Sequence, residues 1–470
     1  MSSSPASSPS EGGGAGGEEE RGDGGDEEIV GGPSDRPPRR SGDPSSTRRR
    51  SADAVWPEHF VESVAVRVAV DAARSDGRLA AGPAMAAIFQ VCSTWRAVSR
   101  SELLWEDATR GVWYRRWSLL PTWHEEFVRL HRTARNFRTR RSAHSHLLPA
   151  ASPALSCRRL ALSDRYLAAG FLDGSIRLFE LPSGLHLTTY RTHPQRDRLG
   201  PFSQSISGLI LLSDPSRLVF ACQDGDLYVA PLDDPVSGST RRAHVGNLME
   251  DGTLVDFAGD SRWWVGLFAG LAGRSWHVWD AETEQLVYEG GSLTDPDSVL
   301  GWRMLTDLDG PTVGRVRTPE PGAMVACTSS RLQVVDLDDP GEVSNQVEFR
   351  RRAVVESVDA CDGRVMVVDL RGLARVLRAR TLAEVCRFST VVRLEGHPQQ
   401  RVQGMVGCMN WGYAVVCSVG SLRVWDASTG EYLYSFRERV GDVTVVAASD
   451  RYVAAWVNDT GLHLWDYGAL

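Results

Sequence analysis

Apolar and polar residues alternate in short runs of one form from Gly174 to the end of the chain. The three clearest runs are Ser275–Asp280, Ser421–Asp426 and Gly461–Asp466, and each of them ends in Trp-Asp. Four weaker copies are Ser175–Glu180, Asp226–Ala230, Arg331–Asp336 and Gly372–Val376. Alternation with a period of two is the pattern of a half-buried β-strand, so we expect seven strands of one kind.

These runs are regularly spaced, and further strand-like runs lie between them. The residues at the Trp position of each copy are Phe179, Ala230, Trp279, Val335, Val376, Trp425 and Trp465, at intervals of 40 to 56 residues. A repeat of roughly 40–50 residues that ends in Trp-Asp is typical of WD-repeat β-propeller blades. The pattern therefore predicts a mainly β fold, with a seven-bladed WD-repeat-like propeller over residues 143–470.

The last copy raises the question of how the propeller closes. In a WD repeat the Trp-Asp strand is the third of its blade, and an outer fourth strand follows it. Only four residues follow Asp466 in this sequence. Because an open sheet edge is a liability that ring closure removes, we expect residues near Ala143–Ala151 to supply the missing strand.

Residues 52–117 have a different pattern, with apolar residues at helical spacing. One such series is Phe60, Val64 and Val68, and a second is Ile88, Val91, Cys92 and Trp95. The pairs Asp76-Gly77 and Gly82-Pro83 interrupt this pattern. We expect a small all-α domain of about three short helices.

One more helix is expected over residues 118–142. Thr122 and Glu125 form a capping box, and Trp123, Phe127 and Leu130 give an apolar stripe. Its later half carries six arginines, which could face a nucleic acid, solvent or a partner protein. We favour a linker helix, because the net charge of the chain is −8 and argues against general nucleic-acid binding.

Residues 1–51 contain Ser, Gly, Pro and charged residues and almost no large apolar side chain, so we expect a disordered tail. Its arginine cluster, which ends at Arg48-Arg49-Arg50, is either a nuclear import signal or a solvated run of charge. The sequence shows no apolar run of about 18 residues, so we expect no membrane span.

The sequence offers little for catalysis or metal binding. The eight cysteines occur singly, without a Cys-x-x-Cys pair, which favours reduced, buried thiols. His124-Glu125-Glu126 lacks the second histidine of a zinc helix. We therefore expect no catalytic residues, no bound metal and no cofactor.

The predicted helical domain resembles an F-box, the module that docks a substrate receptor onto the Skp-type adaptor of a cullin ubiquitin ligase. The resemblance rests on Trp56-Pro57-Glu58 for the family's Leu-Pro-x-Glu, Phe60 and Val64 on the first helix, Val91-Cys92-x-x-Trp95, and Leu104-Trp105 for its closing Leu-Trp. It implies that Trp56, Pro57, Phe60, Val64, Val91, Cys92, Trp95, Leu104 and Trp105 build the adaptor face. It also implies that the propeller holds the substrate.

The order of tail, F-box-like domain, linker helix and propeller is similar to that of the plant STERILE APETALA family. This resemblance covers roughly residues 52–470. It implies a non-catalytic, nuclear receptor subunit that acts in flower and inflorescence development and in organ size. It further implies that the substrates are transcriptional repressors of the PEAPOD and KIX type.

Two questions stay open in the sequence. A nuclear WD-repeat corepressor or scaffold without ligase function is the alternative to a ligase receptor, whereas direct DNA binding is disfavoured by the acidic net charge. All 52 basic residues are arginine, and no lysine is present. Either this protects a receptor from its own ligase, since arginine keeps the charge without an acceptor amine, or it reflects the base composition of the gene.

Overall fold

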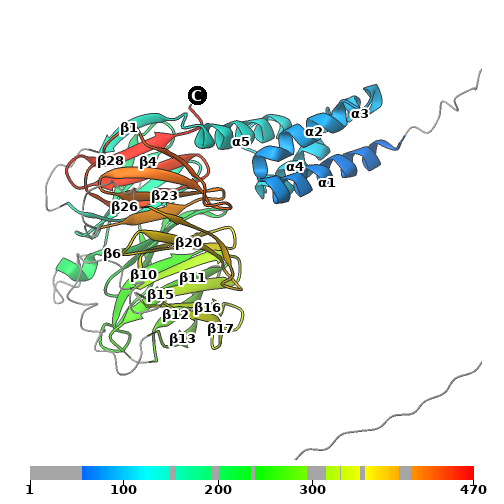
Figure 1. Cartoon of the computed structure of the whole chain (residues 1–470). Coiled ribbons are helices and arrows are strands. Elements are labelled where there is room, and N and C mark those ends of the chain that lie inside the picture. Colours follow the sequence, from blue (N-terminus) through cyan, green and yellow to red (C-terminus); the bar gives the residue numbers. More distant parts are fainter. Residues whose placement is uncertain are drawn as a thin grey trace, which may run out of the picture. The chain divides into compact units, whose positions relative to one another are not determined.

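Helices occupy the N-terminal part of the described chain, and strands form the rest apart from one 3₁₀ turn, η3 (Pro201–Gln204) (Figure 1). The structure is a computed structural model that describes residues 56–148, 155–192, 201–233, 239–271, 273–293, 314–328, 330–349, 355–390 and 404–469. The expected tail, with its arginine cluster, lies outside the described residues.

The helical region consists of α-helices and one 3₁₀ helix. They are α1 (Glu58–Asp76), η1 (Arg78–Ala80), α2 (Ala81–Phe89), α3 (Ser93–Val98), α4 (Glu102–Trp113) and α5 (Trp123–Arg138). The side chain of Thr122 accepts a hydrogen bond from the Glu125 backbone N–H at 3.2 Å, so the expected N-cap of α5 is confirmed. None of the described helices combines the length and the low polarity that a bilayer crossing requires.

The core face of α1 is the stripe of Val61, Ala65 and Ala69, each fully buried. The structure corrects two details of the helical prediction. Gly82-Pro83 lies in the first turn of α2 and does not end a helix, because the N–H groups of a first turn have no partner within the helix. The series from Ile88 is divided between two helices, since Cys92 is the N-cap of α3 with an extended backbone.

Strands follow from residue 143 onward and group in fours. The first strand of each group is β2 (Cys157–Leu162), β6 (Ile206–Ser213), β10 (Thr253–Gly259), β14 (Gly314–Glu320), β18 (Val355–Cys361), β22 (Val406–Met409) or β26 (Val443–Ala448). The second is β3 (Tyr166–Phe171), β7 (Ser216–Cys222), β11 (Trp263–Ala269), β15 (Ala323–Thr328), β19 (Arg364–Asp369), β23 (Tyr413–Ser418) or β27 (Tyr452–Val457).

The third and fourth strands complete these groups. The third is β4 (Ser175–Glu180), β8 (Leu227–Pro231), β12 (Trp276–Asp280), β16 (Arg331–Asp336), β20 (Leu373–Arg378), β24 (Ser421–Asp426) or β28 (Gly461–Asp466). The fourth is β5 (His186–Arg191), β9 (Arg241–His244), β13 (Leu286–Gly290), β17 (Val343–Glu348), β21 (Glu384–Ser389), β25 (Tyr432–Ser435) or, from before the first group, β1 (Ala143–Leu148).

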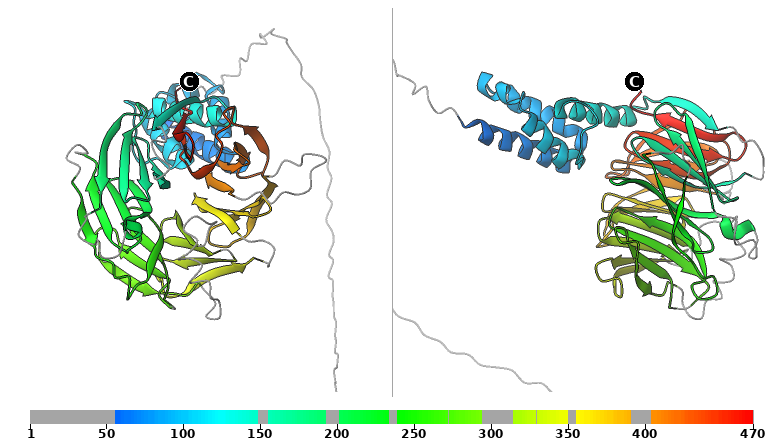
Figure 2. Two further views of the ribbon diagram at one scale, coloured as in Figure 1. Left: turned by 90° about the vertical axis from the view of Figure 1, so that its left-hand side faces the viewer. Right: turned by 180° about the vertical axis from the view of Figure 1, so that it is seen from behind.

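The groups form five four-stranded antiparallel sheets and one eight-stranded sheet. The larger sheet joins two groups through one parallel pair, Phe257 on β10 with Gly208 on β6. The first strands contact one another in the order β2, β6, β10, β14, β18, β22 and β26, and β26 contacts β2. The sheets therefore surround a central axis, as in a β-propeller (Figure 2, left).

The closing strand lies where the sequence predicted it. Strand β1 pairs antiparallel with β28, with His144 opposite Trp465 and His146 opposite His463. The prediction that a segment before the first repeat completes the last sheet is confirmed. Apolar side chains fill the space between the first and the last sheet, where Phe179 and Leu167 belong to the same buried cluster as Trp456.

Candidate functional site

The N-terminal end of α1 presents an exposed aromatic pair. The rings of Trp56 and Phe60 are stacked, with centroids 4.8 Å apart and an interplanar angle of 17°. Trp56 is 53% exposed and Phe60 is 41% exposed. Val64, one turn further along α1, is half-buried. Residues at i and i+4 share a helix face, so Phe60 and Val64 lie along one apolar ridge, which begins at Trp56.

A second exposed group lies at the turn between α2 and α3. Val91 is 63% exposed, and the free thiol of Cys92 is also exposed, whereas Trp95 is half-buried against the helical core. Leu103 on α4, which the sequence pattern did not single out, is 67% exposed. The exposure of Leu103 could have been predicted from the helical period alone, because the core positions of α4 are Leu104 and Trp105, which follow it.

Two predicted adaptor residues do not lie on the surface. Leu104 is 1% exposed and Trp105 is 7% exposed, both within the core of the helical domain. The indole N–H of Trp105 donates to the backbone carbonyl of Ser99 at 2.7 Å, and its ring lies 5.2 Å from that of Phe127. Both residues hold α4 against its neighbours, and Trp105 also lines an open pocket at the edge of this core. Their part in an adaptor face stays a prediction.

An open pocket lies beside this core. It has a volume of about 570 Å³ and is lined by residues of α2, of α4 and of the start of α5, among them Met85, Phe89 and His124. The rings of His124 and Trp105, which both line the pocket, have centroids 4.5 Å apart. Its mixed polar and apolar lining could accept a side chain from a partner.

The C-terminal half of α5 is anchored in the propeller. Phe137 is fully buried, with its ring centroid 4.5 Å from that of Tyr413 and 4.1 Å from that of Tyr467. The phenol of Tyr434 donates to the Phe137 carbonyl at 2.7 Å, and the side-chain amide of Asn136 donates to the Tyr467 carbonyl at 2.9 Å. Aromatic packing and hydrogen bonds together hold this helix end in one position.

A second contact ties the helical region to the loops of the propeller. Tyr114 at the end of α4 is stacked on Trp411, with centroids 5.0 Å apart, and the Arg78 guanidinium lies 3.9 Å from the centroid of the Trp411 ring. Arg115 forms a bidentate ion pair with Asp164. The helical region therefore contacts the propeller through η1 and the end of α4 as well as through α5.

The inner strands of the propeller carry a buried network of opposite charges. Asp256 on β10 lies 3.1 Å from the Arg159 guanidinium and 2.8 Å from that of Arg317. Burial alone would raise the pKa of Asp256, but Arg317 and Arg159 outweigh it and hold the pKa below its usual value. Next to them, burial, together with the adjacent Arg159, lowers the pKa of Arg315 to about 9.

Among the residues that the structure describes, two groups of side chains have ligand atoms close enough to share a metal ion. One is His144, His146 and His463, on β1 and β28; the other is Asp251, His277 and Glu289. In the second group Arg274 lies 2.6 Å from Glu289 and 4.0 Å from Asp251, so a guanidinium already supplies the positive charge there.

Comparisons with known proteins identify a relative of this chain and solved structures that align with part of it. No protein-family model matches the chain. The chain is 48% identical over 434 residues to the Arabidopsis thaliana protein named transcriptional regulator STERILE APETALA, with 90% of this chain and 94% of that protein covered. The structure of U3-55K aligns with 68% of this chain and 98% of its own, at a TM-score of 0.51 and 11% identity. The WD40 β-propeller domain of Doa1 aligns with 69% of this chain and 97% of its own, at a TM-score of 0.46 and 13% identity.

The sheets, arranged around an axis, and the helices before them define a propeller protein with an N-terminal helical region. The identity of this chain to the Arabidopsis protein, over nearly the whole length of both, is high enough to assign its family. This chain belongs to the STERILE APETALA family.

Proposed function

We propose that this protein is the substrate-receptor subunit of a cullin ubiquitin ligase, whose helical domain is an F-box and whose propeller is seven-bladed. The observation that carries the proposal is the exposed stacked pair of Trp56 and Phe60, together with the exposed Val91 in the turn between α2 and α3. Large aromatic side chains at a surface are typical anchors of protein interfaces. An apolar ridge along one helix face suits docking into a groove of a partner.

The contacts of α5 support a receptor role. A receptor must hold its substrate at a fixed place relative to the adaptor, and a mobile linker would lower the effective concentration of the substrate at the ligase. Phe137, held between Tyr413 and Tyr467, joins the helix that follows the F-box-like region directly to the propeller. In this proposal the receptor performs no bond chemistry itself, and ubiquitin transfer belongs to the other subunits.

The substrates in this proposal are nuclear repressor proteins of the PEAPOD and KIX type, recruited by the propeller. Their removal would regulate transcription in flower development and organ size, in agreement with the name of the Arabidopsis relative. The protein would then work in the nucleus. The count of seven blades follows if the eight-stranded sheet is divided at its single parallel pair.

A second function is favoured by one observation. The Arabidopsis relative is named a transcriptional regulator, which also suits a corepressor scaffold without ligase activity. In that case the exposed ridge on α1 would contact a transcription factor in place of an adaptor.

Reconstitution separates the two functions. The full chain is mixed with a purified Skp-type adaptor and cullin, and the complex is isolated by size-exclusion chromatography. We expect co-elution of the wild type and its loss in a Trp56→Ala/Val91→Ala variant, because both changes remove exposed apolar side chains without opening the core. Failure of a folded wild-type chain to co-elute would reject the ligase receptor and favour the scaffold.

A further inference from the structure

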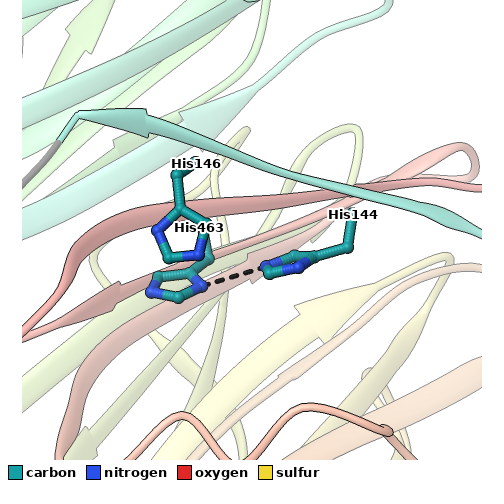
Figure 3. Close-up of side chains that lie close together, drawn as sticks. All are labelled: His144, His146 and His463. Atoms are coloured by element: carbon teal, nitrogen blue, oxygen red, sulfur yellow. Dashed lines mark hydrogen bonds between the residues drawn. The ribbon is translucent and has the colours of Figure 1, made fainter.

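Three histidines meet on one face of the two strands that close the propeller (Figure 3). His144 and His146 are two residues apart on β1, so their side chains point to the same face of the sheet. His463 on β28 lies directly opposite His146, and opposite residues of an antiparallel pair share a face. One ring nitrogen of each histidine lies within 4.8 Å of a nitrogen of the other two.

We propose that His144, His146 and His463 form a binding site for a divalent transition-metal ion of the zinc class, which fastens β1 to β28. Imidazole nitrogens are among the preferred ligands of Zn²⁺, and three protein ligands with an open fourth position are a common arrangement. No carboxylate or thiol is needed for such a site, and a water molecule would complete a tetrahedral set.

The distances suit this ion. Nε2 of His144 lies 3.0 Å from Nδ1 of His463. With Zn–N bonds of about 2.0–2.1 Å, two nitrogens of a tetrahedral site are about 3.3–3.4 Å apart. A small separation of the two rings therefore makes room for the ion. His146 is exposed, so it can turn towards the ion without disturbing the core.

The hydrogen bonds around His463 orient its ring for this purpose. Its Nε2 lies 2.6 Å from the Thr460 hydroxyl, and its Nδ1 faces His144. When Nε2 carries the proton and bonds to Thr460, the lone pair of Nδ1 points into the cluster. Metal-bound histidines are commonly held in this way through their second nitrogen. On metal binding the neutral His144 ring would change tautomer, so that its one N–H proton moves from Nε2 to Nδ1 and the lone pair of Nε2 is free to bind the ion.

The surroundings agree with a bound cation. His463 is only 4% exposed, and His144 is stacked on Trp465 with centroids 4.8 Å apart, so two of the three ligands are held by packing. The carboxylate of Glu438 accepts a hydrogen bond from the Trp465 indole at 3.0 Å and interacts electrostatically with His144. That negative charge would partly balance the ion.

The consequence concerns the closure of the propeller. Strand β1 comes from before the first repeat, and 319 residues separate His144 from His463. A ligand that binds only the folded state stabilises it, and here the ion would link the two ends of the propeller. This inference does not depend on the proposed ligase function.

The test uses the full-length protein, stripped of metal with a chelator and titrated with ZnCl₂ and CoCl₂. His146→Ala is the informative variant, because this exposed residue can be removed without harm to the core. His186→Ala is the matched control, since His186 lies on the outer strand β5 opposite Phe179, as His144 lies opposite Trp465. Calorimetry, the melting temperature and the visible spectrum of bound Co²⁺ are measured for each protein.

We expect about one equivalent of Zn²⁺ to bind to the wild type and to the His186→Ala control, with a rise of several degrees in melting temperature. His146→Ala should bind at least about tenfold more weakly and lose both this rise and the tetrahedral Co²⁺ bands. Equal affinity and equal stabilisation of His146→Ala would overturn the proposal, as would the absence of binding by the wild type.

Discussion

The ring of Phe137 lies parallel to that of Tyr413, with centroids 4.5 Å apart and an interplanar angle of only 4°. Phe137 belongs to α5, whereas Tyr413 begins the second strand of a propeller sheet. On its other side, Phe137 stacks on Tyr467. This packing makes the last turn of the linker helix part of a propeller core, so the helix cannot swing freely at this end.

Phe137→Ala should therefore destabilise the protein by about 3–5 kcal/mol, the usual cost of removing a fully buried Phe. Urea denaturation of the full chain measures the change in the free energy of unfolding. Val128→Ala on the same helix is the control, because Val128 is 39% exposed and its truncation should cost less than about 1 kcal/mol. Equal effects of the two substitutions would mean that Phe137 does not anchor α5.

Asp362 gives a prediction for pH. It lies in the turn between β18 and β19, where burial raises the pKa of its carboxyl to about 6, although Arg78 and Arg364 oppose the change. Between its ordinary pKa near 3.8 and about 6, the folded state holds more of this proton than the unfolded state. The contribution of Asp362 to stability is therefore present at low pH and is lost as pH rises through 6.

Asp362→Asn should remove this dependence. The variant is expected to be more stable than the wild type at pH 7, with a smaller difference at pH 4, because asparagine cannot ionise. Asn also tolerates the positive φ of 53° at this position. Urea midpoints at the two pH values test this, with the exposed Asp459→Asn as control. A difference between variant and wild type that does not change with pH would refute it.

Val419 occupies a backbone conformation that suits other residues better. It lies at the turn between β23 and β24 with φ of 52°, and its side chain is 78% exposed. The left-handed region costs an L-residue about 1–2 kcal/mol, and a β-branched side chain is especially rare there.

Val419→Asn should thus stabilise the protein by about 1 kcal/mol, because Asn visits this region readily. Val419→Ala is the comparison, since it removes the branch but leaves an ordinary L-residue at positive φ. Chemical denaturation should give the order Asn, then Ala, then Val. A Val419→Asn variant no more stable than the wild type would show that the turn carries no strain.

The absence of lysine can be tested in cells. Arg96 and Arg100 are exposed near the predicted adaptor face, and lysine at these sites would offer amines to a nearby ligase. If the protein is a ligase receptor, Arg96→Lys/Arg100→Lys should shorten its half-life after protein synthesis is blocked, whereas Arg96→Gln/Arg100→Gln should not. The same half-life for both variants would favour the base composition of the gene as the cause.

The sequence predicted the strands well because their pattern is local. Alternation and a Trp-Asp ending reveal strands such as β24 and β28 without knowledge of their neighbours, and the count of strands per blade predicted the pairing of β1. The core face of α1 could not be chosen from the sequence, because Phe60, Val64 and Val68 look as apolar as the buried stripe of Val61, Ala65 and Ala69, which includes two small alanines.

The parts of the site that the sequence missed depend on contacts between distant segments. Leu104 and Trp105 match a docking motif, but only packing against the other helices shows that they are buried. The rings that stack on Phe137, those of Tyr413 and Tyr467, belong to residues more than 250 positions further along the chain. The histidine cluster likewise joins β1 to β28, and no local spacing could reveal it.

The central claim is that the ridge of Trp56, Phe60 and Val64 docks a Skp-type adaptor. The most direct measurement is the dissociation constant of the full chain with a purified adaptor by calorimetry, for the wild type, Phe60→Ala and the control Val128→Ala. The account predicts binding by the wild type and the control, and a loss of at least about tenfold for Phe60→Ala, or about 1.4 kcal/mol. Equal affinities of all three proteins, or no binding by a folded wild type, would contradict it.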